Sequence, residues 1–206
     1  MLIKVCGMRN AENIRAVEQT GIDWMGFIFY PPSPRYVDQV PDYMPQQVKR
    51  VGVFVNPTFR QVVDRVKQFG LHAVQFHGTA SPEMCQAFRQ RGLIVIRALP
   101  VTPTFVADTA EYTDKIDYFL FDTPTLKFGG SGKSYDWQLL RRYTGPTPFL
   151  LSGGLSLQSV PQLQQFTHPF LAGYDLNSGF EIEPAVKDAT QIHKFVNLQI
   201  CKSENV

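Results

Sequence analysis

Short apolar segments alternate with helix-like segments along nearly the whole chain of 206 residues. An alternation of strands and helices is typical of α/β proteins built on a parallel sheet. Eight such units, at ~25 residues each, lie at the compact end of the range for a closed barrel. We therefore expect a single-domain α/β protein, a (β/α)8 TIM barrel, although an open doubly wound sheet fits the same alternation. The apolar runs predict strands at residues 2–6, 24–29, 51–55, 73–77, 93–98, 118–122, 147–152 and 172–176.

Three of the expected helices have clear boundaries in the sequence. Thr58 is a typical N-cap for a helix over Phe59–Phe69, and Gly70 is a typical stop. Ser81-Pro82-Glu83 combines a cap, a first-turn proline and a first-turn acid, so it predicts the start of another helix. Apolar residues at helical spacing predict the last helix from Glu183 to about Gln199.

Composition narrows the class of protein. An apolar fraction of 44% is enough for a sizeable core, and we expect one catalytic barrel domain over residues 1–200 with a C-terminal tail at 201–206. The net charge of +2 without a basic stripe argues against a nucleic-acid partner, and no apolar run approaches the ~20 residues of a membrane span. The chain opens on a strand pattern rather than a leader, and its three widely spaced cysteines favour a reducing, cytoplasmic setting.

Two of the predicted strands end on groups that can move a proton. Cys6 closes the first strand and Asp122 closes the sixth. In a barrel the carboxyl ends of the strands surround the active site, so these distant residues can meet over one substrate. Taken singly, Cys6 could be a small buried hydrophobe and Asp122 a loop ion pair or cap. Together they predict a general base and a general acid that need no metal or cofactor.

Side-chain alternation predicts which groups face the barrel interior. Lys4 shares a face with Cys6, and its ammonium would lower the pKa of the thiol. We also expect inward-facing polar side chains at Gln75 and His77, at Arg97, and at Asp175 and Asn177. His77 could equally be a hydrogen-bonded core histidine. So many polar groups at one end of the barrel indicate a site.

Glycine-rich loops follow three of the predicted strands. Gly129-Gly130 lies in a loop that lacks the spacing of a phosphate-binding P-loop, so we interpret it as an active-site loop or a surface loop. Gly153-Gly154 and Asn177-Ser178-Gly179 follow strands seven and eight, where small residues let backbone N–H groups approach a phosphate. Arg35 could hold a carboxylate through its fork of donors or lie in solvent.

In combination, these motifs resemble the phosphoribosylanthranilate isomerase family of tryptophan biosynthesis over essentially the whole chain. The opening strand Lys4-Val5-Cys6-Gly7-Met8-Arg9 is similar to that of the family, as is the run Ser33-Pro34-Arg35-Tyr36-Val37. The segment from Gly129 to Trp137 resembles the family stretch GGTGxxFDW. Ser152-Gly153-Gly154-Leu155 and the run from Asp175 to Glu181 complete the set.

The resemblance implies an Amadori rearrangement of N-(5'-phosphoribosyl)anthranilate to 1-(2-carboxyphenylamino)-1-deoxyribulose 5-phosphate, the third step from chorismate. Asp122 would be the general acid, Cys6 the general base, and Arg35 the partner of the anthranilate carboxylate. The resemblance also implies phosphate binding at the loops after strands seven and eight and supporting roles for His77 and Asp175. It implies a small phosphorylated sugar–anthranilate substrate, no cofactor, and a monomer or weak homodimer.

Two other functions remain open from the residues alone. The histidine-pathway isomerase performs the same rearrangement with a different aglycone, but it carries an Asp at the end of strand one, where this chain has Cys6. A non-catalytic anion-binding barrel would keep the glycine loops and would not need both Cys6 and Asp122.

Overall fold

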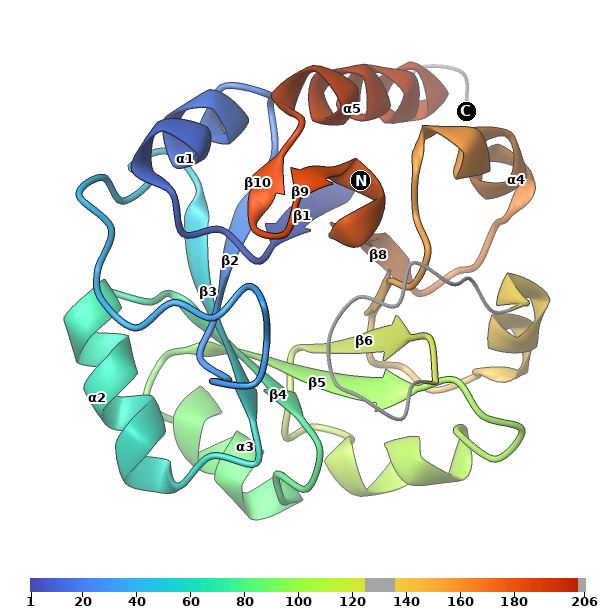
Figure 1. Cartoon of the computed structure of the whole chain (residues 1–206). Coiled ribbons are helices and arrows are strands. Elements are labelled where there is room, and N and C mark those ends of the chain that lie inside the picture. Colours follow the sequence, from blue (N-terminus) through green and yellow to red (C-terminus); the bar gives the residue numbers. More distant parts are fainter. Residues whose placement is uncertain (125–135, 204–206) are drawn as a thin grey trace.

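A closed parallel barrel forms the centre of the protein (Figure 1). The computed structural model describes residues 1–124 and 136–203, with the side chains of 107–108 and 199–203 excepted. Strands β1 to β8 pair in sequence order, and β8 pairs with β1 to close the barrel, which confirms the predicted (β/α)8 TIM barrel. The strands are Leu2–Cys6, Trp24–Ile28, Lys49–Val55, Ala73–His77, Ile94–Pro100, Tyr118–Asp122, Phe149–Leu151 and Leu171–Leu176.

The sequence signals for two of the covering helices are confirmed. Helix α2 spans Phe59–Phe69, its N-terminus is fixed by a capping box between Thr58 and Gln61, and Gly70 ends it in the left-handed conformation. Helix α3 spans Pro82–Arg89, after the cap residue Ser81. The other helices that precede the C-terminal one are α1 at Ala11–Glu18 and α4 at Val160–Gln165.

Fewer helices cover the barrel than eight regular βα units would supply. The connection from β2 to β3, residues 29–48, contains no helix. Five prolines interrupt this stretch, and each removes a backbone donor that a helix interior would need. The connections after β5 and β6 carry only the 3-10 segments Ala107–Tyr112 and Trp137–Arg142 among their described residues.

The prediction of a last helix starting at Glu183 was wrong. Strands β9 (Glu181–Glu183) and β10 (Val186–Lys187) form a small antiparallel hairpin there, and Ala185 turns between them at φ 71°. Helix α5 spans Ala189–Ser203. It begins there because the Asp188 carboxylate caps its N-terminus by accepting the backbone N–H of Gln191. This helix passes residue 200, and the division between a domain at 1–200 and a tail at 201–206 stays a prediction.

The barrel interior changes from apolar to polar along its axis. Near the amino ends of the strands it is filled by the buried side chains of Trp24, Val51, Ala73, Ile96, Leu120 and Leu150. Towards the carboxyl ends the inward positions include the polar side chains of Lys4, Cys6, Gln75 and Asp175 beside the apolar Ile28 and Val53, all of them buried. The polar end of the barrel is therefore where a site can form.

No helix among the described residues is long and apolar enough to cross a membrane.

The prediction that Arg97 faces the interior was wrong. Ile96 pairs in register with Gln75, and neighbouring residues of a parallel pair share a face, so Arg97 points outward. Its guanidinium donates to the carbonyl oxygens of Phe76 and Gly78 and lies 5.0 Å from the ring centroid of Tyr112. Arg97 therefore braces the outside of the barrel.

Candidate active site

Cys6 lies at the carboxyl end of β1 beside a buried ion pair. The Lys4 ammonium is 2.8 Å from a carboxylate oxygen of Asp175, and both side chains are buried. Gly26 of the adjacent strand leaves room for these groups. A Cβ atom at that position would lie 2.9 Å from the Cys6 sulfur and 3.3 Å from the Lys4 nitrogen. Strands β1, β2 and β8 thus hold the thiol, the ammonium and the carboxylate close together.

The pKa of the Cys6 thiol departs from the expected direction. Burial raises this pKa above its usual value, and the nearby Asp175 carboxylate adds to the effect. The ammonium groups of Lys4 and Lys187 act in the opposite direction without outweighing burial. Lys4 does lower the pKa of the Cys6 thiol, as expected, but the expectation that the thiol has a lowered pKa was wrong, because burial has the larger effect. In this environment the thiol is the dominant form at neutral pH.

Asp122 lies at the end of β6, where its carboxylate accepts the backbone N–H of Thr123 at 2.8 Å. Burial raises the pKa of Asp122 to about 6, and the Asp175 carboxylate adds to this while Thr123 and Ser152 oppose it. Gly153, on the loop after β7, comes so close that a Cβ atom there would lie 3.2 Å from the Asp122 carboxylate. Asp122 is therefore a carboxyl group that can hold a proton near pH 6, next to one of the predicted phosphate loops.

His77 faces the barrel mouth at the end of β4. Its Nε2 atom is 2.6 Å from the amide nitrogen of Gln75. The Gln75 amide and the His77 imidazole therefore hydrogen-bond to each other, and the tautomer of the ring sets which of them donates. Burial, together with the Lys4 ammonium and the Arg97 guanidinium, lowers the pKa of His77 to about 3. His77 is therefore neutral, a hydrogen-bonding group rather than a cation.

Arg35 is held by a carboxylate of the protein itself. Its Nε and Nη2 atoms donate to the two oxygens of Glu181 at 2.8 and 2.6 Å. Gly7, which follows Cys6 at φ 86°, allows this approach, because a Cβ atom there would lie 2.7 Å from the Arg35 side chain. Arg35 is buried and lies over the residue next to Cys6, so it is not the solvated loop arginine of the alternative interpretation.

The two predicted phosphate loops lie against each other. Gly153 and Gly154 adopt φ of 91° and 69°, conformations that favour glycine. After β8, Ser178–Phe180 forms a short 3-10 turn, and Gly179 packs so tightly on the carbonyl of Leu155 that a Cβ atom would overlap it. The third predicted loop residues, Gly129 and Gly130, lie outside the described residues.

Two charged residues of this end of the barrel were not predicted. Glu181 pairs with Arg35, and Lys187 donates to Glu181 at 2.6 Å and to the Asn177 side chain at 2.7 Å. The sequence pattern placed Glu181 in a loop and Lys187 near the start of the last helix. The alternation of side chains along a strand therefore did not predict that either residue faces the site. Their positions are set by tertiary contacts of the β9–β10 hairpin with Asn13 on α1 and with Asn177 after β8.

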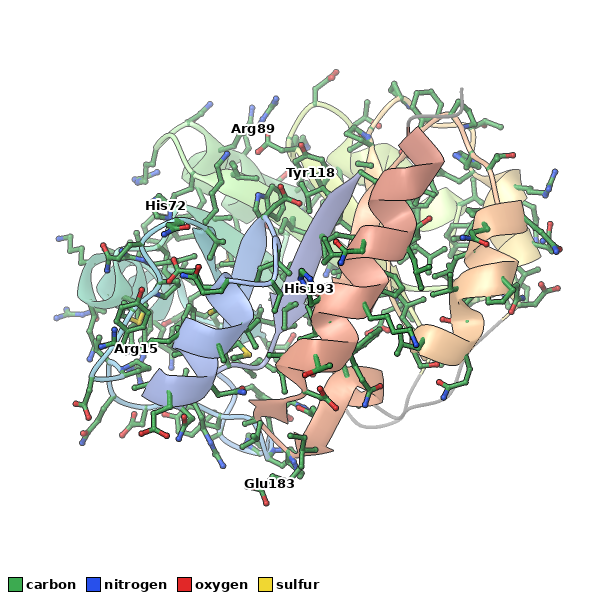
Figure 2. All side chains as sticks on the ribbon, turned by 90° about the horizontal axis from the view of Figure 1, so that it is seen from above. Arg15, His72, Arg89, Tyr118, Glu183 and His193 are labelled. Atoms are coloured by element: carbon green, nitrogen blue, oxygen red, sulfur yellow. The ribbon has the colours of Figure 1, made fainter. Side chains whose placement is uncertain are left out.

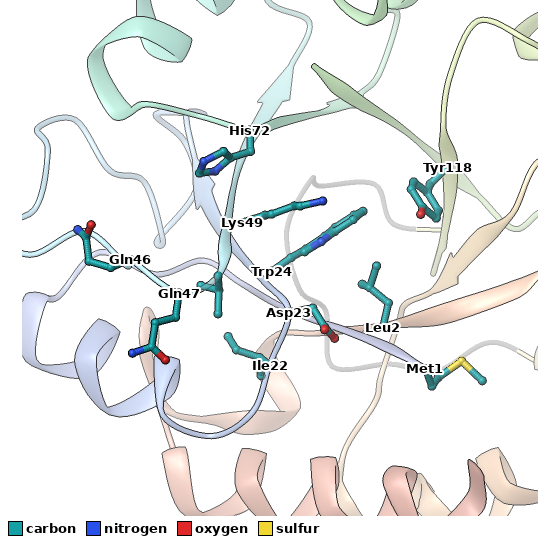
Figure 3. Close-up of a pocket in the computed structure, with 11 residues that line it drawn as sticks. Met1, Leu2, Ile22, Asp23, Trp24, Gln46, Gln47, Lys49, His72 and Tyr118 are labelled. Carbon is teal, nitrogen blue, oxygen red and sulfur yellow. The ribbon is translucent and has the colours of Figure 1, made fainter. Parts of the chain in front are cut away.

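A separate pocket of about 650 Å³ lies at the opposite end of the barrel (Figure 3). It is lined by Trp24, Lys49, His72 and Tyr118, from the amino ends of the strands, among other residues. Figure 2 shows His72 and Tyr118 at one end of the molecule and Glu183 of the β9–β10 hairpin at the other. None of the predicted site residues lines this pocket.

Comparison with known proteins agrees with the fold. The family model of N-(5'phosphoribosyl)anthranilate (PRA) isomerase matches residues 3–198. A relative from Phocaeicola vulgatus, named N-(5'-phosphoribosyl)anthranilate isomerase, is 50% identical over 198 residues, which cover 96% of this chain and 97% of the relative. A relative of the same name from Parabacteroides distasonis is 45% identical over 95% of this chain and 92% of its own length.

Solved structures show the same similarity. A phosphoribosyl anthranilate isomerase from Thermotoga maritima superposes with a TM-score of 0.83 at 32% identity, over 98% of this chain and 99% of that one. Another, solved with reduced 1-(o-carboxyphenylamino)-1-deoxyribulose 5-phosphate, gives a TM-score of 0.80 at 30% identity, over 98% of this chain and 100% of that one. The match over nearly the full length shows that this chain belongs to the N-(5'-phosphoribosyl)anthranilate isomerase family.

Proposed function

We propose that this chain converts N-(5'-phosphoribosyl)anthranilate to 1-(2-carboxyphenylamino)-1-deoxyribulose 5-phosphate, with Asp122 as general acid and Cys6 as general base. The isomerase activity in tryptophan biosynthesis rests on family membership over residues 3–198. One structural observation supports the acid assignment most directly. The Asp122 carboxyl has a pKa raised to about 6 and lies next to Gly153 of a glycine loop suited to phosphate.

Asp122 and Cys6 then supply one proton transfer each, and no external oxidant or reductant is needed. Asp122 donates a proton to the furanose ring oxygen, the C1'–O bond breaks, and the nitrogen lone pair forms the C1'=N double bond of a Schiff base. The Cys6 thiolate removes the proton from C2', and that electron pair forms C1'=C2' as the C=N electrons return to nitrogen. The resulting enolamine tautomerises to the ketone. One proton is given and one is taken, so the substrate and product are isomers.

Cys6 acts as a base only in its minority thiolate form. The raised pKa of Cys6 makes that form scarce, but a thiolate so formed is flanked by Lys4 and by the electrostatic influence of Lys187 and Arg35. A base of high pKa is intrinsically strong, which suits removal of a proton from carbon. The environment thus limits the amount of thiolate and increases its basicity.

The remaining predicted residues have binding roles in this proposal. Arg35 binds the anthranilate carboxylate, and Gly129 and Gly130 belong to a loop that contacts the substrate. Neutral His77 and the ion-paired Asp175 orient the sugar by hydrogen bonds. The phosphate is bound by the backbone of the two adjoining loops, at Gly153, Gly154, Asn177, Ser178 and Gly179.

Substrate turnover followed by fluorescence tests the proposal. Anthranilate and phosphoribosyl pyrophosphate are converted to the unstable substrate by a coupled phosphoribosyltransferase, and purified protein is then added. We expect rapid loss of substrate fluorescence with the wild-type protein. Asp122→Asn should remove nearly all turnover and keep affinity for the reduced product analogue, and Cys6→Ser should lose on the order of 10²-fold or more in kcat. Near-normal turnover in Asp122→Asn would refute the acid assignment.

The same preparation answers the two remaining questions about the substrate and the assembly. Turnover of the histidine-pathway substrate alone would favour that isomerase, and phosphate binding without any turnover would favour a binding barrel. We further propose a cytoplasmic monomer or weak homodimer, with residues 1–200 as the catalytic barrel and 201–206 as a tail. One solved relative from Thermotoga maritima is described as a dimeric enzyme. Sedimentation at increasing protein concentration distinguishes these states.

A further inference from the structure

A buried cluster of three charges lies beside Cys6, and Glu181 is at its centre. Glu181 accepts hydrogen bonds from Arg35 Nε, Arg35 Nη2, Lys187 Nζ and the backbone N–H of Ala185, at distances from 2.6 to 3.0 Å. Burial works against ionisation of Glu181, but Arg35 and Lys187 lower the pKa of this carboxyl to about 2. Glu181 is therefore a fixed anion between two cations.

Burying these three charges gives little stability. Removing a guanidinium, an ammonium and a carboxylate from water carries a large desolvation cost for each ion, and their mutual attraction often does no more than offset this cost. Well-packed apolar side chains could join the β9–β10 hairpin to the barrel as well. The hairpin also has a separate anchor, because the side chain of Asn13 on α1 pairs with both the N–H and the C=O of Lys187. A function other than anchoring is therefore the better explanation of the cluster.

The geometry of Arg35 shows what that function can be. A guanidinium has five N–H donors arranged along two edges that each match a carboxylate. Glu181 occupies the edge formed by Nε and Nη2. Within the described residues no side chain takes the second edge, formed by Nη1 and Nη2. The stem of Arg35 packs on Gly7, immediately after the Cys6 base.

We propose that Glu181 is a positioning residue for the isomerase reaction, which holds one edge of the Arg35 guanidinium so that the other edge receives the anthranilate carboxylate. The inference rests on the proposed function, because it takes the Arg35–carboxylate contact as its starting point. The ring of the substrate is thereby oriented before the sugar reacts. Holding a flexible arginine in place in advance reduces the entropy lost on binding.

Lys187 completes the arrangement by linking the cluster to the phosphate loop. Its ammonium bridges Glu181 and the Asn177 side chain, and Asn177 begins the loop after β8. Lys187 also balances the charge of Glu181, so the cluster keeps one net positive charge for the anionic substrate. The anthranilate and phosphate ends of the substrate are therefore held by one connected network.

Binding of two matched ligands tests the role of Glu181. The first is reduced 1-(o-carboxyphenylamino)-1-deoxyribulose 5-phosphate, and the second is the same molecule without the carboxyl group. We expect Glu181→Gln to weaken the first ligand about 10- to 100-fold and to change the second less than about threefold. In steady-state assays KM should rise while kcat stays within about threefold, because the carboxylate is remote from the reacting atoms.

Control variants separate positioning from folding. Glu183→Gln makes the same charge change at an exposed position of the same strand and should leave both affinities unchanged. The double variant Glu181→Gln, Lys187→Gln removes two opposite buried charges together, so it keeps the charge balance, and its loss should again be larger for the carboxylated ligand. An equal loss for both ligands in both variants would mean a structural role and would overturn the proposal.

Failure of the inference can be told apart from failure of the proposed function. If the wild-type protein prefers the carboxylated ligand and turns over substrate, but Glu181→Gln keeps the same preference, only the role of Glu181 is refuted. If the wild-type protein binds both ligands equally, the contact assigned to Arg35 is refuted and the positioning role with it. Absence of turnover in the wild-type protein would refute the proposed function itself.

Discussion

Acid should destabilise this protein through His77, and the substitution His77→Gln should remove that part of the effect. His77 is neutral in the folded protein because burial, Lys4 and Arg97 lower its pKa to about 3, whereas the ordinary value is 6.5. The unfolded chain therefore binds a proton at this residue between those two values and the folded protein does not. Stability must fall as the pH falls through this window.

The size of the effect follows from the two pKa values. Between pH 7 and pH 5, protonation of His77 in the unfolded state alone should lower the free energy of unfolding by about 2 kcal/mol. The ring is partly exposed, so water screens some of the perturbation. Because the unfolded chain alone takes up the proton between pH 7 and pH 5, the effect in this interval depends little on how far below pH 5 the folded-state pKa lies.

Urea unfolding at pH 7, 6 and 5 measures the difference, with the two buried tryptophans, Trp24 and Trp137, as fluorescent probes. The wild-type protein should lose about 2 kcal/mol more than His77→Gln over this interval. His193→Gln is the matched control, since it makes the same substitution at an exposed position on α5, outside the barrel interior. Equal pH dependence in wild type and His77→Gln would refute the buried neutral imidazole.

Two further predictions concern catalysis and the polar interior. The rate constant kcat/KM should rise with pH up to about 6 and stay level above it, until the raised pKa of Cys6 is reached. Between these two pKa values, each rise in pH removes protonated Asp122 and adds Cys6 thiolate in equal proportion, so the active fraction of the enzyme stays constant. A decline just above pH 6 in a pH–rate profile would contradict this pairing of pKa values. Lys4→Met should lower the free energy of unfolding by about 3–5 kcal/mol, because it leaves the Asp175 carboxylate buried without its partner. Urea titration checks this, and a loss below about 1 kcal/mol would mean that Asp175 finds another partner or water.

Much of the architecture could be predicted because it depends on local pattern. The apolar runs and their spacing identified the eight strands, and the Thr58 and Ser81 caps located two helices. These signals involve residues close in sequence, and the physics that produces them is the same in any chain. The positions of Cys6 and Asp122 at the ends of their strands could be predicted for the same reason. Their proximity follows because the carboxyl ends of barrel strands meet at one mouth.

What the sequence alone determined is the barrel and the placement of Lys4, Cys6, Asp122 and Asp175 on the inward faces of its strands. The tertiary structure decided which way Arg97 points, where the last helix begins, and which anion holds Arg35. It also decided that burial outweighs Lys4 at Cys6 and that His77 is neutral. These outcomes depend on strand register and on the balance between desolvation and charges from distant segments, and neither quantity exists until the chain has closed into the barrel.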